Sequence, residues 1–267
     1  MSSNILAWAA VALYAAAEAL SIRSLLRPRS RTGVPVLLAA GLVLHFIGLY
    51  LRARAIGSVP YRTLSGSLLL FGWMLALACL ILLVRHGERA IGPFLIPFVL
   101  LVSAAGLLLP TSVSPATPET RGTLFALHVT LGILAYAAFT LSFVLSLLYL
   151  IQNRQIRRAR TGLLFARLPA LDVIGRMNRT SVSIGLGALG VSVLLGALWA
   201  QRVWHSLADP KLAWAIVTLL LYGLLLWMDR RGWEGRRVAL LSMLGFGVMI
   251  FSYTFVNLYT STEHVFR

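Results

Sequence analysis

Residues 199–214, WAQRVWHSLADPKLAW, connect two long apolar runs and decide how the chain is interpreted. Apolar runs of about 20 residues cross membranes as helices, so the segment between them is predicted to be a loop at a membrane surface. This tryptophan segment contains three tryptophans, one histidine, one aspartate and two cations. Tryptophan is enriched at membrane interfaces without any ligand, which makes an aromatic belt one interpretation. The histidine and Asp209-Pro210-Lys211 favour a second interpretation, a binding site.

The composition of the whole chain is that of an integral membrane protein. Of its 267 residues, 59% are hydrophobic and 12% are charged, and the mean hydropathy is +0.85. A soluble domain would have about 25% charged residues. The apolar runs are continuous rather than alternating, which argues against a transmembrane barrel. We therefore predict an all-α polytopic membrane protein with one integral-membrane domain, residues 1–267, and about eight transmembrane helices, at residues 4–22, 34–51, 64–84, 91–109, 124–151, 181–198, 212–228 and 238–258.

The cations are distributed unevenly along the chain. The formal net charge of +16 would suit a nucleic-acid partner, but nearly all cations are arginines in short segments between apolar runs. The odd-numbered loops contain 17 of the 24 Lys and Arg residues. By the positive-inside rule, these loops face the cytoplasm, and both termini face the outer, periplasmic side. The pattern predicts a protein of the bacterial inner membrane and no nucleic-acid partner.

Ionisable or reactive side chains are rare within the apolar runs. Glu18 lies near the basic end of the first run and is expected to pair with Arg23, with a buried functional acid as the less favoured alternative. Cys79 is the only cysteine, which excludes a disulfide, a CxxC pair and a cysteine-rich zinc site. His45 lies about eleven residues into the second run, roughly 16 Å from its inner end at the rise of a helix. An ionisable group at that depth needs a function or a partner, such as a hydrogen bond from a neutral imidazole to a neighbouring helix.

The predicted topology brings three of the five histidines to the outer side. His128 opens the fifth run, His205 lies in the tryptophan segment, and His264 follows the last run. Neutral imidazole is an axial ligand of haem iron, and tryptophan stacks on flat apolar rings such as porphyrin. Zinc fits less well, because dispersed histidines do not explain the tryptophans. Haem propionates attract cations, and the predicted outer side offers candidates for this contact in Arg121, Arg202 and Lys211.

The tryptophan segment resembles the WWD motif of the CcsA/ResC family of cytochrome c assembly proteins, and of the family's relatives HemX and YpjD. The matching residues are, in order, Gly196-Ala197-Leu198-Trp199-Ala200, Trp204, Asp209-Pro210-Lys211 and Trp214-Ala215. Similarity extends over most of the chain and includes Leu127-His128-Val129, Ala135-Tyr136-Ala137, Arg179-Thr180-Ser181 and Val256-Asn257-Leu258.

The resemblance implies that haem b binds transiently on the outer face, with His128 and His264 as its axial ligands. It also implies that His45 is a haem contact within the membrane. The chain would present haem to apocytochrome c together with a ResB/CcsB-like membrane subunit, as part of a haem lyase complex. The motif residues implied to bind the cofactor are Trp199, Trp204, Asp209 and Trp214.

The motif is degenerate in this chain. Leu207 and Ala208 stand where haem-handling members have two more tryptophans, and Trp227 stands where they have a second membrane histidine. The pattern is therefore nearer to the HemX/YpjD branch. Two other functions stay open. One is a non-haem accessory or regulatory membrane subunit, linked to a divalent-cation transporter. The other is a scaffold whose tryptophans only anchor helix ends.

Overall fold

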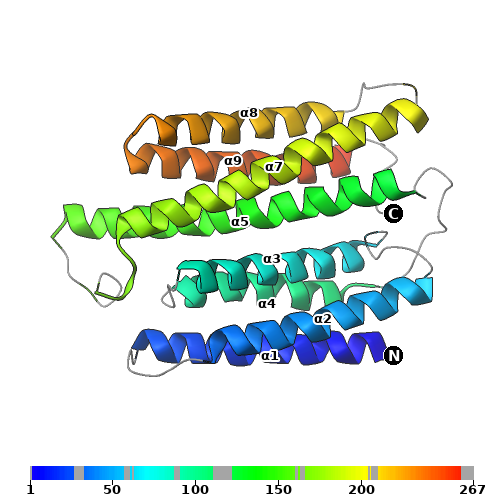
Figure 1. Cartoon of the computed structure of the whole chain (residues 1–267), viewed down its shortest axis with the longest axis horizontal. Coiled ribbons are helices and arrows are strands. Elements are labelled where there is room, and N and C mark those ends of the chain that lie inside the picture. The colour runs from blue at the N-terminus through cyan, green and yellow to red at the C-terminus, as the bar shows by residue number, and fades with distance from the viewer. Residues whose placement is uncertain are drawn as a thin grey trace. The chain divides into compact units, whose positions relative to one another are not determined.

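The computed structural model describes residues 2–26, 33–56, 61, 63–86, 91–110, 122–159, 162, 166–203, 205 and 210–259. Regular structure in these residues is helical throughout, which confirms the predicted all-α class. Each predicted apolar run coincides with one helix (Figure 1), and all but the fourth, residues 91–109, lie wholly within it. The helices are α1 (Ser2–Leu26), α2 (Val34–Ile56), α3 (Leu64–His86), α4 (Gly92–Leu108), α5 (Thr123–Arg157), α7 (Leu171–Val203), α8 (Pro210–Arg230) and α9 (Gly235–Tyr259).

Within the described residues, six helices are long and apolar enough to cross a membrane: α1, α2, α3, α5, α7 and α8. α4 is also apolar but has only 17 residues. A hydrocarbon core about 30 Å thick requires about 20 apolar helical residues, and the six helices meet that requirement. The chain is therefore a polytopic membrane protein, as predicted, while the side that each terminus faces stays a prediction.

Two helices extend further than predicted into the Arg-rich connector between the fifth and sixth runs. α5 continues to Arg157, and α7 begins at Leu171. Arginine favours helix, and its aliphatic stem lies along apolar surface while its charged head reaches water. Asp172 in the first turn of α7 complements the helix dipole and pairs with Arg176 one turn later. The two helices therefore continue through charged residues that lie beyond the apolar runs used to predict their ends.

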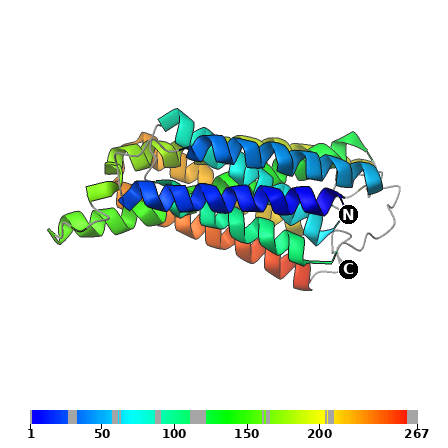
Figure 2. The same cartoon turned by 90° about the horizontal axis from the view of Figure 1, so that it is seen from below.

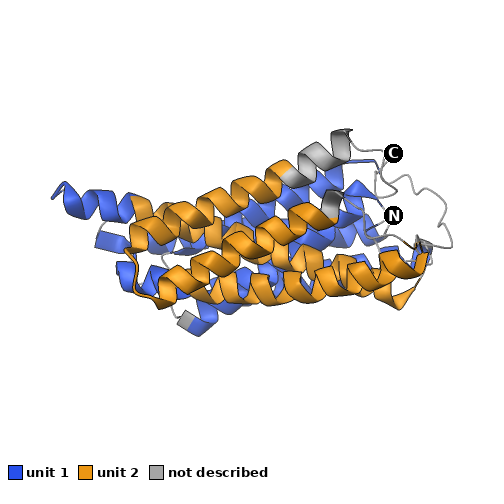
Figure 3. Ribbon diagram, turned by 90° about the horizontal axis from the view of Figure 1, so that it is seen from above, with its two compact units in different colours: residues 1–113, 151–177 blue, residues 114–150, 178–267 orange. Residues whose placement is uncertain are grey.

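The chain divides into two compact units, coloured separately in Figure 3. Unit 1 comprises residues 1–113 and 151–177, and unit 2 comprises residues 114–150 and 178–267. Each unit is described by itself. The expectation of one integral-membrane domain stays a prediction.

In unit 1, α1 to α4 pack as a closed set of four helices. α1 contacts α2 and α4, and α3 contacts the same two helices. α1 and α2 run side by side in Figures 1 and 2. A Cβ at Gly41 on α2 would lie 2.5 Å from the Tyr14 ring, and one at Gly48 would lie 3.1 Å from the Ser3 carbonyl oxygen. The two glycines therefore let α1 and α2 approach closely, which is the usual role of small residues between membrane helices.

Glu18 does not form the predicted pair with Arg23. Its Oε2 is buried and has no hydrogen-bond partner among the described residues, while Arg23 is exposed. Positions five apart in a helix are separated by roughly 140° around the axis, so the two side chains lie on different faces of α1. Glu18 instead shares a face with Tyr14 and Ser21, both of which are buried.

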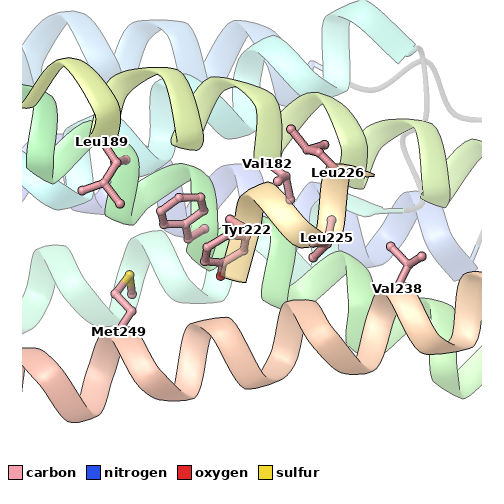
Figure 4. Close-up of a cluster of buried hydrophobic side chains, with 9 residues drawn as sticks. Val182, Leu189, Tyr222, Leu225, Leu226, Val238 and Met249 are labelled. Carbon is pink, nitrogen blue, oxygen red and sulfur yellow. The ribbon is translucent and has the colours of Figure 1, made fainter. Parts of the chain in front are cut away.

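The core of unit 2 joins α5, α7, α8 and α9 (Figure 4). Phe139 on α5 stacks on Tyr222 on α8, with ring centroids 3.8 Å apart and planes 5° apart. A Cβ at Gly185 on α7 would lie 2.5 Å from the Phe139 ring, and one at Gly245 on α9 would lie 3.0 Å from the Tyr222 ring. The stacked pair therefore fills the space that these glycines leave. The other buried residues of this core are Ala135, Val182, Leu189, Leu225, Leu226, Val238 and Met249.

Candidate functional site

His128 lies in the second turn of α5, near the end of unit 2 where that helix begins. Its Nδ1 is 2.7 Å from the backbone carbonyl oxygen of Ser192 on α7. A carbonyl oxygen only accepts hydrogen bonds, so Nδ1 donates its proton to it and the lone pair of the neutral ring is on Nε2. Metal-binding histidines usually have their other ring nitrogen bonded in this way, because the bond fixes the tautomer and the orientation of the ring. His128 thus shares one feature with metal-binding histidines, a hydrogen bond from Nδ1 to a backbone carbonyl.

The helices α5 and α7 approach closely around this imidazole. Ser192 Oγ donates a hydrogen bond to the carbonyl oxygen of His128 at 2.8 Å and lies 3.2 Å from Nδ1 of the same residue. Gly196, one turn further along α7, faces the ring, since a Cβ there would lie 2.6 Å from Cε1 and Nδ1. On α5, a Cβ at Gly132 would lie 3.3 Å from Ser192 Oγ. Both glycines therefore make room for the contact between the helices.

Aromatic rings pack beside His128. The centroid of Phe125, one turn earlier on α5, is 6.5 Å from the centroid of His128 and 4.9 Å from that of Trp199 on α7. Trp199 is only 6% exposed, so its indole packs within the protein. Trp214 on α8 is half-buried and meets Phe251 on α9 edge-on, with centroids 5.5 Å apart. The two described tryptophans of the segment therefore pack on phenyl rings of unit 2.

The tryptophan segment contains less loop than predicted. α7 continues to Val203, and α8 begins at Pro210, in the first helical turn where proline is favoured. Between them, His205 is exposed and has a φ of 51°. Arg202, near the end of α7, is also exposed. Four predicted site residues and the side chain of a fifth lie outside the described part of the chain: Arg121, Trp204, Asp209, His264 and Lys211.

The antiparallel packing of α5 and α9 indicates which helix ends in unit 2 lie together. Tyr149 near the end of α5 contacts Gly235 at the start of α9. Seven residues earlier on α5 and seven residues later on α9, Ser142 Oγ lies 2.6 Å from Ser242 Oγ. Because both helices rise equally per residue, the same register puts His128 level with the last turn of α9. The start of α5 and the end of α9 therefore lie at the same end of unit 2.

His45 lies in unit 1 and is 1% exposed. Its Nδ1 is 3.4 Å from the hydroxyl of Tyr14, which links α1 to α2 through a long hydrogen bond. Its Nε2 is buried and has no hydrogen-bond partner among the described residues. Buried polar atoms rarely lack a partner, so His45 fits both the neighbouring-helix contact, through Nδ1, and a ligand, through Nε2.

The side chains available as metal ligands limit the kind of metal site that His128 can form. Across the residues that the structure describes, no group of three or more His, Cys, Asp or Glu side chains is placed to bind a metal ion. A metal at His128 therefore needs ligands from a cofactor or from other parts of the chain. Haem iron meets this condition, because the porphyrin supplies the equatorial nitrogens and the protein supplies only axial ligands.

Sequence reasoning missed two residues that contact this site, Ser192 and Phe125. The signal for Ser192 is its spacing, since Ser192 and Gly196 are four residues apart, as are His128 and Gly132. Such pairs share a helix face. Which two faces meet depends on how α5 and α7 cross, and this crossing is visible only in the structure.

Comparison with known proteins identifies related sequences over most of the chain. Residues 61–264 match a family model described as Cytochrome C assembly protein. A protein of Chlamydomonas reinhardtii described as cytochrome c biogenesis protein CcsA is 29% identical over 248 residues, which cover 89% of this chain and 67% of that protein. CcsA proteins of Prochlorococcus marinus are 29% identical over 264 residues (strain MIT 9301; 89% of this chain, 85% of that protein) and 31% identical over 230 residues (strain MIT 9312; 75% and 74%). The matched family range includes His128, the tryptophan segment and His264, whereas His45 precedes it.

Proposed function

Because the chain belongs to the cytochrome C assembly protein family, we propose that it binds haem at the end of unit 2 that contains His128 and presents this haem to apocytochrome c. Its helices make it an integral membrane protein, and its family places it in cytochrome c assembly. The observation that supports the proposal is the Nδ1 hydrogen bond from His128 to the Ser192 carbonyl, which puts the lone pair of the neutral ring on Nε2, the atom proposed to coordinate iron.

His264 is the proposed second axial ligand. α9 ends at Tyr259, and its last turn is level with His128 in the register of unit 2. His264 follows Tyr259 by five residues, and a segment of that length extends up to about 17 Å. That reach is enough to bring an imidazole to the second face of a porphyrin bound through His128.

Aromatic and charged side chains of the tryptophan segment complete the proposed site. Trp199 supports His128 through Phe125, since each ring packs on the next. Trp204 and Trp214 are assigned to contact with the flat porphyrin, for which indole is suited. Asp209 lies in the same segment and is assigned to the cofactor site with them. The propionates are assigned to the cations Arg121, Arg202 and Lys211.

In this proposal the protein supplies binding and orientation rather than the reacting groups. Haem, as the substrate, brings its vinyl groups, and the client apocytochrome brings the cysteine thiols of a CxxCH segment. A ResB/CcsB-like membrane subunit would complete the haem lyase complex. The bacterial inner membrane is the proposed location, with the haem site on the outer side.

His45 is the proposed haem contact within the membrane. Its buried Nε2 has no hydrogen-bond partner among the described residues, which suits a ligand at that atom. The position that matches the family's second membrane histidine is Trp227, which is 50% exposed with its ring 5.5 Å from the guanidinium of Arg231. Any haem bound at His45 therefore takes its second ligand from elsewhere, or has only one protein ligand.

Absorption spectroscopy tests the proposed function. The protein is purified from haem-replete cells, and haem is added to samples that lack it. We expect a Soret band that His128→Ala and His264→Ala each weaken. The matched control is His86→Ala, which removes an imidazole at the end of α3, in unit 1, and is expected to leave the band unchanged. A protein that stays colourless after haem is added would contradict the proposal and favour a non-haem accessory or regulatory role.

A further inference from the structure

Where α5 and α7 cross, His128 contacts α7 through both its ring and its backbone carbonyl. On α5 the contact residues are His128 and Gly132, and on α7 they are Ser192 and Gly196. Each pair is four residues apart and therefore shares one helix face. The α5 face contributes the His128 imidazole, and the α7 face contributes the Ser192 carbonyl as acceptor and the backbone of Gly196 against the ring. The contact therefore restrains the imidazole as well as packing the two helices.

We infer that Ser192 and Gly196 are positioning residues, which fix the tautomer and the plane of His128 before haem binds. The inference rests on the proposed function, because it assigns these residues to the ligand that the haem site requires. Neither residue needs to touch haem. Both act through the imidazole.

The carbonyl of Ser192 fixes the tautomer. It lies 2.7 Å from Nδ1 and accepts the proton that Nδ1 carries. A histidine with the other tautomer would direct a lone pair from Nδ1 at the carbonyl oxygen, which is repulsive, and would carry the proton on Nε2, where iron must bind. The carbonyl therefore selects the form of the ring that coordinates through Nε2.

Gly196 fixes the plane of the ring. A Cβ at this position would lie 2.6 Å from both Cε1 and Nδ1, so the imidazole rests directly on the α7 backbone. The hydroxyl of Ser192 adds a third restraint, since it donates to the carbonyl oxygen of His128 at 2.8 Å and so ties the α5 backbone to α7. A ring restrained in this way loses little freedom when it binds iron, which is how preorganisation raises affinity.

The variants of α7 differ in which restraint they remove. Gly196→Ala places a methyl group where the ring lies and forces the ring to move. Ser192→Ala removes the hydroxyl but keeps the carbonyl acceptor. Gly190→Ala is the matched control, because it adds the same methyl group to the same helix at a position with nothing within 4 Å.

Nuclear magnetic resonance of the haem-free, full-length protein with ¹⁵N-labelled histidine reads the ring directly. His128→Ala identifies the His128 signals by their loss. We expect the wild type, Ser192→Ala and Gly190→Ala to show a protonated Nδ1 and an unprotonated Nε2. Gly196→Ala should shift these signals or show a mixture of tautomers. Thermal unfolding of each variant shows that it is folded.

Haem titration of the same samples gives the functional consequence. Loss of a residue that orients a metal ligand typically weakens metal binding by about 10-fold to 100-fold. We expect Gly196→Ala to raise the dissociation constant for haem by at least about 10-fold, Ser192→Ala by less, and Gly190→Ala not at all. A folded Gly196→Ala protein with wild-type signals and wild-type haem affinity would overturn the inference.

The two readouts separate this inference from the proposed function. If the wild type binds no haem but its His128 shows the expected tautomer and responds to Gly196→Ala, the haem proposal fails. The inference that Ser192 and Gly196 fix the tautomer and plane of the His128 ring then stands. If haem binds through His128 and neither readout responds to Gly196→Ala, the haem proposal stands and the positioning role fails.

Discussion

Replacing Ser142 with alanine tests the buried polar cluster that connects three helices of unit 2. Ser142 Oγ on α5 donates a hydrogen bond to Asn178 Oδ1 on α7 at 2.6 Å. It also lies 2.6 Å from Ser242 Oγ on α9, and because its single proton is used, Ser242 must be the donor in that bond. All three side chains are buried. One substitution therefore removes two hydrogen bonds and leaves two buried groups without those partners.

The expected loss of stability in Ser142→Ala follows from the free energies measured for hydrogen bonds between membrane helices. Such bonds average about 0.6 kcal/mol and reach about 1.7 kcal/mol in double-mutant cycles. Two bonds of about 2.6 Å place Ser142→Ala at a loss of about 1–3 kcal/mol. The change removes one oxygen and leaves the methyl carbon in place, so the cavity term is small. The predicted loss is therefore almost entirely that of hydrogen bonding.

Ser146, one turn later on α5, is the matched control. It is fully buried like Ser142, but its Oγ has no hydrogen-bond partner among the described residues. Removing an unsatisfied buried hydroxyl relieves a cost rather than creating one, so Ser146→Ala should leave the stability unchanged or raise it. The assay is the free energy of reversible unfolding in detergent micelles, measured for wild type, both single variants and Ser242→Ala.

Equal effects of Ser142→Ala and Ser146→Ala would refute the reasoning, because only the first breaks hydrogen bonds. A second check is the double variant with Ser242→Ala. Residues that share a hydrogen bond are coupled, so the loss in the Ser142→Ala/Ser242→Ala protein should be smaller than the sum of the two single losses. Full additivity would show that the contact between the two hydroxyls contributes nothing.

Two further substitutions test other contacts of unit 2. Gly185→Ala puts a Cβ 2.5 Å from the Phe139 ring and should lower the free energy of unfolding by about 1–3 kcal/mol through overpacking; Gly187→Ala, with nothing within 4 Å, should not lower it, and equal losses would contradict the packing described. Asp229→Asn removes the ion pair with Arg179, whose side chain is 50% exposed against 19% for Asp229, so the loss should be below about 1 kcal/mol and shrink as salt screens the pair. A large loss that persists at high salt would show that the pair is not screened as its exposure implies.

The fold could be predicted from the sequence because apolar length alone identifies membrane helices. Every predicted run coincides with a helix of the structure, and only the fourth run extends beyond its helix, by one residue at each end. The helix ends were less accurate, since α5 continues through Arg154 to Arg157 and α7 begins at Leu171, ten residues before the predicted start. A charged side chain ends an apolar pattern but not a helix, because its head reaches water beyond the hydrocarbon. The failed pairing of Glu18 with Arg23 has a related cause, because proximity along the chain does not place two residues on the same helix face.

The candidate site was predictable only in part. The resemblance of the sequence predicted His128 as a ligand and Trp199 as a porphyrin contact, and both roles stay predictions; the structure places both residues near Phe125 in unit 2. The sequence could not show that Ser192 bonds the imidazole, because that contact depends on which faces of α5 and α7 meet. Nor could it show that Trp199 is buried, since tryptophan is favoured equally at a ligand, at a membrane interface and in a core. These roles depend on tertiary contacts, which one sequence does not specify.

The central claim is that one haem binds between His128 and His264, and electron paramagnetic resonance of the haem-loaded protein tests it most directly. With ¹⁵N-labelled histidine, the iron of the wild-type protein should be low-spin and coupled to two imidazole nitrogens, as two axial histidines require. His128→Ala and His264→Ala should each remove one of the two couplings and change the spin state. A bound haem whose couplings survive both substitutions, or a wild-type spectrum with no histidine coupling, would contradict the account.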